Sequence, residues 1–133
     1  TALKIKSREK HLFYDNLIAV DWYFFTNCLL NGYSAVFTIE TRTYYRQHEK
    51  NLIGAFNFDK SKIVRAVDAK YYHYMAMSKL YANYIPFYEK YGRLKNKLED
   101  DHENFIYEYS KIVNSNIEQN PFWWEKIKCI EEM

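Results

Sequence analysis

The most apolar stretch of the chain is Leu17–Ile39, and it carries a single charged residue, Asp21. Apolar positions there follow helical spacing and surround the helix axis, as expected of a helix contacted on several sides. We expect this helix to begin near Ser7, whose hydroxyl can cap the first turn. It should end at Asn31-Gly32, where Gly32 takes the left-handed conformation. The pattern therefore predicts a buried central helix.

The sequence makes a separate prediction for each of two side chains in this helix. Asp21 would be a buried carboxylate, which needs a compensating partner. Arg42, Arg65 or a Tyr hydroxyl is expected to provide it. Cys28 lies in apolar surroundings and is expected to be a buried thiol.

Residues 35–58 fit two patterns. Their β-branched and aromatic residues are typical of strands, which would pair as a small hairpin. The helical interpretation starts from Ser34 as N-cap and continues through apolar positions at helical spacing. Because residues 46–50 contain no turn former and an isolated hairpin is marginally stable, we prefer the helix.

The next helix has a clear start signal in Asp59-Lys60-Ser61. Apolar and Tyr side chains then recur at steps of three and four residues as far as Tyr84 or Ile85. Pro86 follows, and since proline lacks a backbone donor, we expect the helix to end or kink there.

The C-terminal part continues the helical pattern. The apolar stripe over 87–113 predicts either one long helix or two, the second capped by Asp100 or Asp101. The polar residues 114–120 are expected to form a loop, after which Pro121 opens a last helix.

Together these patterns predict an all-α protein in which residues 1–133 form one domain. The expected architecture is a single compact bundle of five to six helices around the central apolar helix. The alternative is an α+β fold with a small hairpin at 35–58. Only three Gly and two Pro in 133 residues support long helices.

Charge and hydropathy constrain the location and the ligands. Asp21 and the neighbouring Asn and Gly residues are costly within a bilayer, so no membrane span is expected. A net charge of +2 gives no clear basic stripe, so no nucleic acid is expected. The two cysteines form no CxxC pair, and the first residues contain no apolar signal segment, so a reducing cytoplasmic setting is expected.

Cofactor and metal chemistry finds little support. Glu99-x-x-His102 has the spacing found in carboxylate-bridged di-iron bundles, but a second such pair is absent. No Gly-rich phosphate loop occurs, and no Ser lies in a Gly-flanked elbow. We therefore expect no metal, no cofactor and no enzymatic activity.

One short motif points to catalysis instead. The segment Arg42-Thr-Tyr-Tyr-Arg-Gln-His48 resembles the arginine–histidine motif of HEPN-type ribonucleases, although Thr43 stands where that family commonly has Asn, Asp or His. The resemblance covers seven residues. It implies that His48 acts as general base or acid toward a 2′-hydroxyl and that Arg42 stabilises the phosphate. A metal-independent ribonuclease is therefore the alternative function.

Aromatic residues predict a protein-binding surface. Tyr, Trp and Phe make up 20% of the chain, and Tyr and Trp are enriched at interface hot spots. The partner-binding candidates are Tyr71, Tyr72, His73, Trp123 and Trp124.

The leading interpretation is a non-enzymatic protein that binds and inhibits another protein. Ile, Lys, Asn and Tyr contribute fifty residues, as in the products of AT-rich genes. Small proteins of this composition are often immunity proteins, antitoxins or phage proteins. We therefore expect an immunity protein or antitoxin that neutralises a bacterial toxin domain by direct binding. A third interpretation is a phage or structural protein that forms oligomers.

Overall fold

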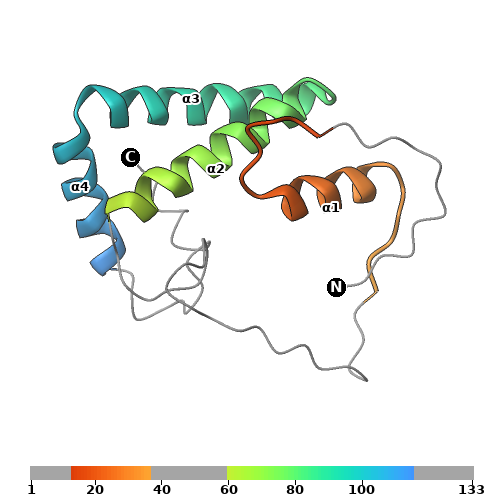
Figure 1. Cartoon of the computed structure of the whole chain (residues 1–133), viewed down its shortest axis with the longest axis horizontal. Helices are drawn as coiled ribbons and strands as arrows, with labels where there is room; N and C mark the ends of the chain where they lie inside the picture. The colour runs from red at the N-terminus through yellow and green to blue at the C-terminus, as the bar shows by residue number, and fades with distance from the viewer. Residues whose placement is uncertain (1–12, 37–59, 116–133) are drawn as a thin grey trace.

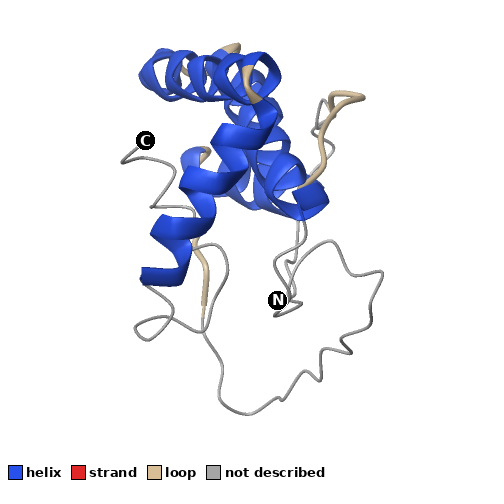
Figure 2. Ribbon diagram, turned by 90° about the vertical axis from the view of Figure 1, so that its left-hand side faces the viewer, coloured by secondary structure: helices blue, strands red, loops and turns tan. Residues whose placement is uncertain are grey.

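The computed structural model describes residues 13–36 and 60–115, and these residues form helices joined by short loops (Figure 2). The elements are α1 (Val20–Leu30), α2 (Lys60–Ser78), the 3₁₀ turn η1 (Ala82–Tyr84), α3 (Ile85–Asp100) and α4 (His102–Ser115). No strand occurs in this part of the chain, so the prediction of an all-α fold is confirmed for it. The predicted total of five to six helices is not confirmed.

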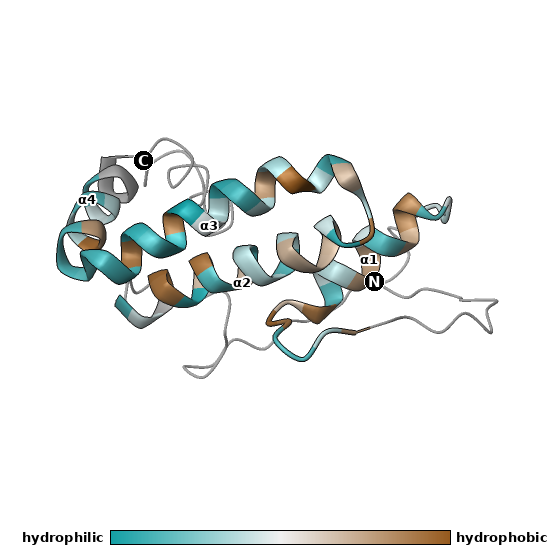
Figure 3. Ribbon diagram, turned by 90° about the horizontal axis from the view of Figure 1, so that it is seen from above, coloured by the Kyte–Doolittle hydropathy of each residue, from teal (hydrophilic) through white to brown (hydrophobic). Residues whose placement is uncertain are grey.

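The helices α2 and α3 form a hairpin, and α1 and α4 lie at its opposite ends (Figure 1). Seen from above, α2 and α3 run side by side, and α4 crosses one end (Figure 3). An ion pair ties the two hairpin helices together, because Lys95 Nζ lies 2.5 Å from Asp68 Oδ1. Both side chains are largely shielded from water, which makes this pair more effective than a fully exposed one.

The larger core lies between α2, α3 and α4. Each helix contributes apolar side chains at three- and four-residue steps, which places them on one face. The buried members are Ile63, Ala66, Val67, Tyr91, Leu94, Leu98, Phe105, Ile106 and Tyr109.

A smaller core joins α1 to the C-terminal end of α2. Tyr23 of α1 packs on Ala76 and Met77, and Tyr14 and Tyr81 cover this contact. The two cores together show that α2, and not α1, is the helix contacted on the most sides.

The predicted central position of α1 is therefore not confirmed. Only Tyr23, Asn27 and Cys28 of this helix are buried, whereas Leu29 is 52% exposed. Its apolar residues surround the axis, but α2 covers just one side of it. The expectation of a buried Cys28 is confirmed, since this side chain is 2% exposed.

The start of α1 was also predicted wrongly. Residues 13–19 are not helical, and the helix begins at Val20. A turn replaces the expected helical segment, in which the Leu17 N–H donates to the Tyr14 carbonyl at 3.1 Å. The Asp-Asn pair inside this turn explains the difference, because these residues favour turns over helix.

The predicted end of α1 is confirmed. Gly32 has φ +85°, the left-handed conformation. The Tyr33 N–H donates to the Cys28 carbonyl at 3.0 Å, and the Gly32 N–H donates to the Leu29 carbonyl at 3.1 Å. This pair of bonds is the Schellman motif, which satisfies the last carbonyls of the helix.

Asp21 is exposed, contrary to the expectation of a buried carboxylate. Its Oδ1 accepts a hydrogen bond from the Trp22 N–H at 2.9 Å in the first turn of α1. A carboxylate in the first turn also interacts favourably with the helix dipole, so Asp21 needs no buried cation.

Pro86 begins a helix where we expected it to end or kink one. α2 already ends at Ser78, and Tyr81 is extended with φ −138° and ψ 116°. Pro86 then lies in the first turn of α3, where its missing donor costs nothing.

The break between α3 and α4 agrees with one of the two predicted alternatives. Asp101 leaves the helical region with φ −141° and ψ 73°, and its Oδ1 accepts a hydrogen bond from the Asn104 N–H at 3.3 Å. Asp101 thus caps a new helix.

Most of the segment 35–58 lies outside the described residues, which omit 37–59. The choice between a helix and a hairpin for this segment therefore stays a prediction.

Substituting Gly32 and Gly92, whose surroundings the structure describes, gives two stability measurements that can be compared with each other. A Cβ at Gly92, within α3, would lie 3.7 Å from Tyr71 Cε2, an ordinary contact. Gly92→Ala should therefore raise the free energy of unfolding by about 0.5–1 kcal/mol, because glycine is unfavourable within a helix. Gly32→Ala should lower it by about 1–2 kcal/mol, since alanine is strained at φ +85°. Urea denaturation measures both, and equal effects of the two substitutions would contradict the assignment.

Candidate functional site

A cluster of aromatic rings from α1, α2, η1 and α3 surrounds Tyr74. The Tyr74 ring stacks with two neighbours, with centroid distances of 5.3 Å to Phe87 and 5.1 Å to Tyr91. Trp22 makes a T-shaped contact with it at a centroid distance of 5.7 Å, and the Tyr84 centroid lies 6.1 Å away. We call these five residues the Tyr74 cluster.

The Tyr74 cluster is buried on one side and accessible on the other. Tyr91 is fully buried beneath it, whereas Phe87 is 46% exposed. Trp22, Tyr74 and Tyr84 are partly exposed. Their rings contact one another, so each ring restricts the motion of its neighbours. A rigid, partly exposed aromatic surface of this kind loses little entropy when a partner covers it.

The short connection after α2 explains how sequence-distant rings meet. α3 turns back along α2, so Phe87 and Tyr91 near its start reach Tyr74 near the end of α2. Tyr84 in η1 packs on Phe87 at 6.1 Å and closes the cluster at the end of the hairpin.

Trp22 is held in the cluster by a stack on His73. The two ring centroids are 3.5 Å apart and the ring planes differ by 5°. His73 is 1% exposed, and its Nδ1 has no hydrogen-bond partner within the described residues. Burial, together with the positive charge of Lys70, lowers the pKa of His73 to about 4. The imidazole is therefore neutral at pH 7, and neutrality permits its close stacking.

A polar network fixes α1 beside the cluster. The Tyr81 hydroxyl donates to Asn27 Oδ1 at 3.0 Å and accepts from Asn31 Nδ2 at 3.0 Å. Asn27 is buried, so this bond satisfies a polar group that would otherwise be costly. Burial also raises the pKa of Tyr23, which lies in the same small core.

A second aromatic group lies on the other flank of the hairpin. Tyr71 contacts Tyr72 at 5.2 Å and Tyr88 at 5.5 Å. A hydrogen bond with Tyr88, followed by burial, raises the pKa of Tyr71. Lys95 Nζ lies 5.8 Å from the ring centroids of Tyr71 and Tyr72 and is already paired with Asp68. These rings mainly hold α2 against α3.

The structure therefore places the predicted site residues in different environments. Tyr71 and Tyr72 are half-buried at the hairpin, while His73 is in the interior and offers no surface for contact. Trp123, Trp124, Arg42 and His48 lie outside the described residues, so predictions about them are untested.

Sequence reasoning missed Trp22, Tyr84 and Phe87. Trp22 lies inside the most apolar stretch, which the sequence pattern predicts to be a buried helix. The spacing of Tyr81, Tyr84 and Phe87, three residues apart on either side of Pro86, was an available signal for a turn with aligned aromatic rings.

Glu99 and His102 do not share a helix face, because the helix break at Asp101 separates them. Glu99 Oε1 instead lies 3.2 Å from Lys95 Nζ. Across residues 13–36 and 60–115, no three His, Cys, Asp or Glu side chains gather as a metal site would require. None of the helices in these ranges combines the length and apolarity needed to cross a bilayer.

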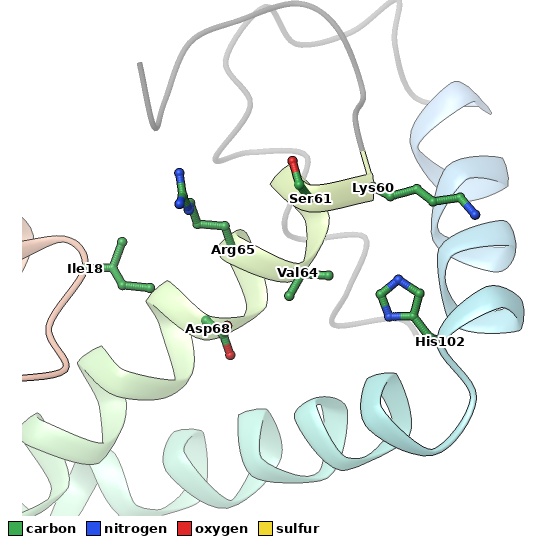
Figure 4. Close-up of a pocket in the computed structure, with 7 residues that line it drawn as sticks. All are labelled: Ile18, Lys60, Ser61, Val64, Arg65, Asp68 and His102. Carbon is green, nitrogen blue, oxygen red and sulfur yellow. The ribbon is translucent and has the colours of Figure 1, made fainter. Parts of the chain in front are cut away.

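A shallow pocket of about 490 Å³ lies between the start of α2, the start of α4 and Ile18 (Figure 4). The charged side chains at its wall point in different directions (Figure 4). Two of them already have partners, since Lys60 pairs with Glu103 at 2.7 Å and Asp68 pairs with Lys95. The wall therefore brings no set of polar groups onto one ligand, and the Tyr74 cluster is the stronger candidate. The lining residues are Ile18, Lys60, Ser61, Val64, Arg65, Asp68 and His102.

The comparisons with known proteins add no relative. No protein-family model, curated protein or solved structure matches the chain. Any statement about function therefore rests on the geometry described above.

The buried His73 makes stability depend on pH. Its pKa is about 4 in the folded protein and about 6.5 in an unfolded chain, so between these values only the unfolded chain takes up the proton. The free energy of unfolding should therefore fall by about 2 kcal/mol between pH 8 and pH 5. Urea denaturation at several pH values measures this change.

His73→Phe is the matched control, because phenylalanine keeps a ring beneath Trp22 and cannot titrate. The difference in stability between the two proteins should grow as the pH falls from 6.5 to 5. If the free energies of unfolding of the two proteins changed equally with pH, the assignment of His73 as a buried, neutral imidazole would be wrong.

Proposed function

We propose that this protein acts by binding another protein through the Tyr74 cluster. The observation that carries the proposal is a set of interlocked, partly exposed rings at the meeting point of α1, α2, η1 and α3. Tyr and Trp dominate interface hot spots because they bury a large area at a small entropic cost. A stable interface needs about 800 Å² on each partner, so the cluster would form its centre and charged side chains its rim.

The class of binder that we propose is an immunity protein or antitoxin that neutralises a bacterial toxin domain. The composition typical of AT-rich genes supports this class, and the small size of the chain suits a protein that works by covering a partner. The partner would be encoded beside it, because such pairs must be made together.

The binding proposal is tested with Phe87→Ala. This residue is 46% exposed, so its truncation should leave the fold intact and weaken the complex at least tenfold, or about 1.4 kcal/mol. The partner in the assay is the product of the adjacent gene, with affinity measured by calorimetry and neutralisation by growth of cells that express both proteins.

Tyr107→Ala is the matched control for this test. Tyr107 is 57% exposed on α4, where Lys111 Nζ lies 4.1 Å from its ring centroid, and it belongs to no part of the Tyr74 cluster. Its truncation should leave affinity and growth unchanged. Equal losses from both substitutions would contradict a binding site at the cluster.

The two other functions predict different results. A ribonuclease would degrade RNA as the isolated protein, and His48→Ala would abolish that activity. An oligomer-forming protein would increase in mass with concentration in light scattering and bind no foreign partner. Either outcome, without a complex, overturns the binding proposal.

A further inference from the structure

The charges of the described residues are unevenly distributed along the chain. Residues 60–98 contain nine Lys and Arg and only two Asp and Glu. Residues 99–108 contain five Asp and Glu and no Lys or Arg. The hairpin is therefore basic as far as Leu98, whereas α3 ends in Glu99 and Asp100, and the net charge of the whole chain is only +2.

Three of the hairpin cations continue the line of the Tyr74 cluster along α3. Phe87, Lys90, Arg93 and Lys97 follow one another at steps of three and four residues, which places them on one flank of the helix. Arg93 and Lys97 are exposed. We call Lys90, Arg93 and Lys97 the basic flank. With Phe87 it covers eleven residues, whose ends lie about 15 Å apart along the helix.

Two members of the basic flank have no internal counter-charge. Within the described residues, neither Lys90 nor Arg93 lies within ion-pair distance of a carboxylate, whereas Lys60, Lys95 and Lys111 each do. Lys70 adds a cation on α2 near the cluster, since its Nζ lies 2.8 Å from the Tyr91 hydroxyl. The Tyr74 cluster thus has positive charge on both hairpin helices.

Two observations favour an acidic protein segment over a nucleic acid. Single-stranded nucleic acids bind by stacking bases on free ring faces, but the Tyr74 ring already stacks with Phe87 and with Tyr91. The basic flank also ends at an acidic turn, where Glu99, Asp100 and Asp101 would repel a continuing phosphate backbone. A compact segment about 15 Å long avoids that repulsion.

From these observations we infer that the partner presents a short acidic helix to this surface. An apolar side chain of the partner packs on Phe87, and its carboxylates lie opposite Lys90, Arg93 and Lys97. Complementary charge of this kind accelerates association and selects the partner. The inference rests on the proposed function and adds the chemistry of the partner to it.

The test uses the full chain and three fluorescein-labelled peptides of fifteen residues. All three share one leucine face at helical spacing, and their other positions carry Glu, Gln or Lys. Fluorescence anisotropy at 50 mM NaCl should show the Glu peptide binding at least tenfold more tightly than the Gln peptide. The Lys peptide should bind more weakly still. Raising NaCl to 300 mM should remove most of the difference, because salt screens exposed charges.

Charge reversal on the flank supplies the specific control. Arg93→Glu should weaken binding of the Glu peptide about tenfold and leave the Gln peptide unchanged. Lys111→Glu changes the net charge of the protein equally but lies on α4, so it should alter neither affinity by more than twofold. Equal effects of the two substitutions would show that only overall charge matters and would overturn the inference.

The remaining outcomes separate this inference from the proposed function. If the Glu and Gln peptides bind equally and Phe87→Ala weakens both, the apolar anchor stands and the acidic partner is rejected. If a fifteen-residue oligothymidylate binds more tightly than the Glu peptide, the surface is a nucleic-acid site and the inference is wrong. If the adjacent gene product binds but Arg93→Glu has no effect on its affinity, the inference fails while the proposed function holds.

Discussion

The stack of Trp22 on His73 is the contact on which the arrangement of α1 depends. α1 touches the hairpin through one side only, and this ring pair, with the Tyr81 hydroxyl bonds, defines how it sits. The stack needs a neutral imidazole because the ring is sealed from water and has a cation, Lys70, nearby. A protonated His73 would place an unpaired charge in the interior. The position of Trp22, and with it one edge of the Tyr74 cluster, follows from that requirement.

Tyr74 connects the two cores of the described part. Its ring packs on Tyr91, which belongs to the core between α2, α3 and α4. It also contacts Tyr84, which covers the small core beneath α1. A single side chain therefore holds together the packing of all four elements at that end of the hairpin. This explains why the surface there is aromatic: rings large enough to span both cores also reach the solvent.

The parts of the fold that follow from local chemistry were predictable. Asn31-Gly32 ends α1 because only nearby backbone groups and a left-handed residue are needed, and Asp101 caps α4 in the same way. The beginning of α1 also follows from a local signal, the turn-forming Asp15-Asn16 pair, whereas the role of Pro86 depends on distant contacts. Tyr81 bonds to Asn27 of α1 and fixes the link that turns the chain before Pro86. The candidate site depends on the same contacts, so Trp22 and Phe87, 65 positions apart in the sequence, could not be joined from spacing alone.

If the proposed partner contacts Trp22, α1 acquires a thermodynamic role in recognition. A partner that touches Trp22 binds only molecules in which α1 is docked, so part of its binding free energy is spent on holding α1 in place. By linkage, the complex resists local opening of α1 more strongly than the free protein does. A substitution in the small core, far from any partner, would then weaken binding by reducing the docked population. The buried side of α1 would in this sense contribute to the proposed binding surface.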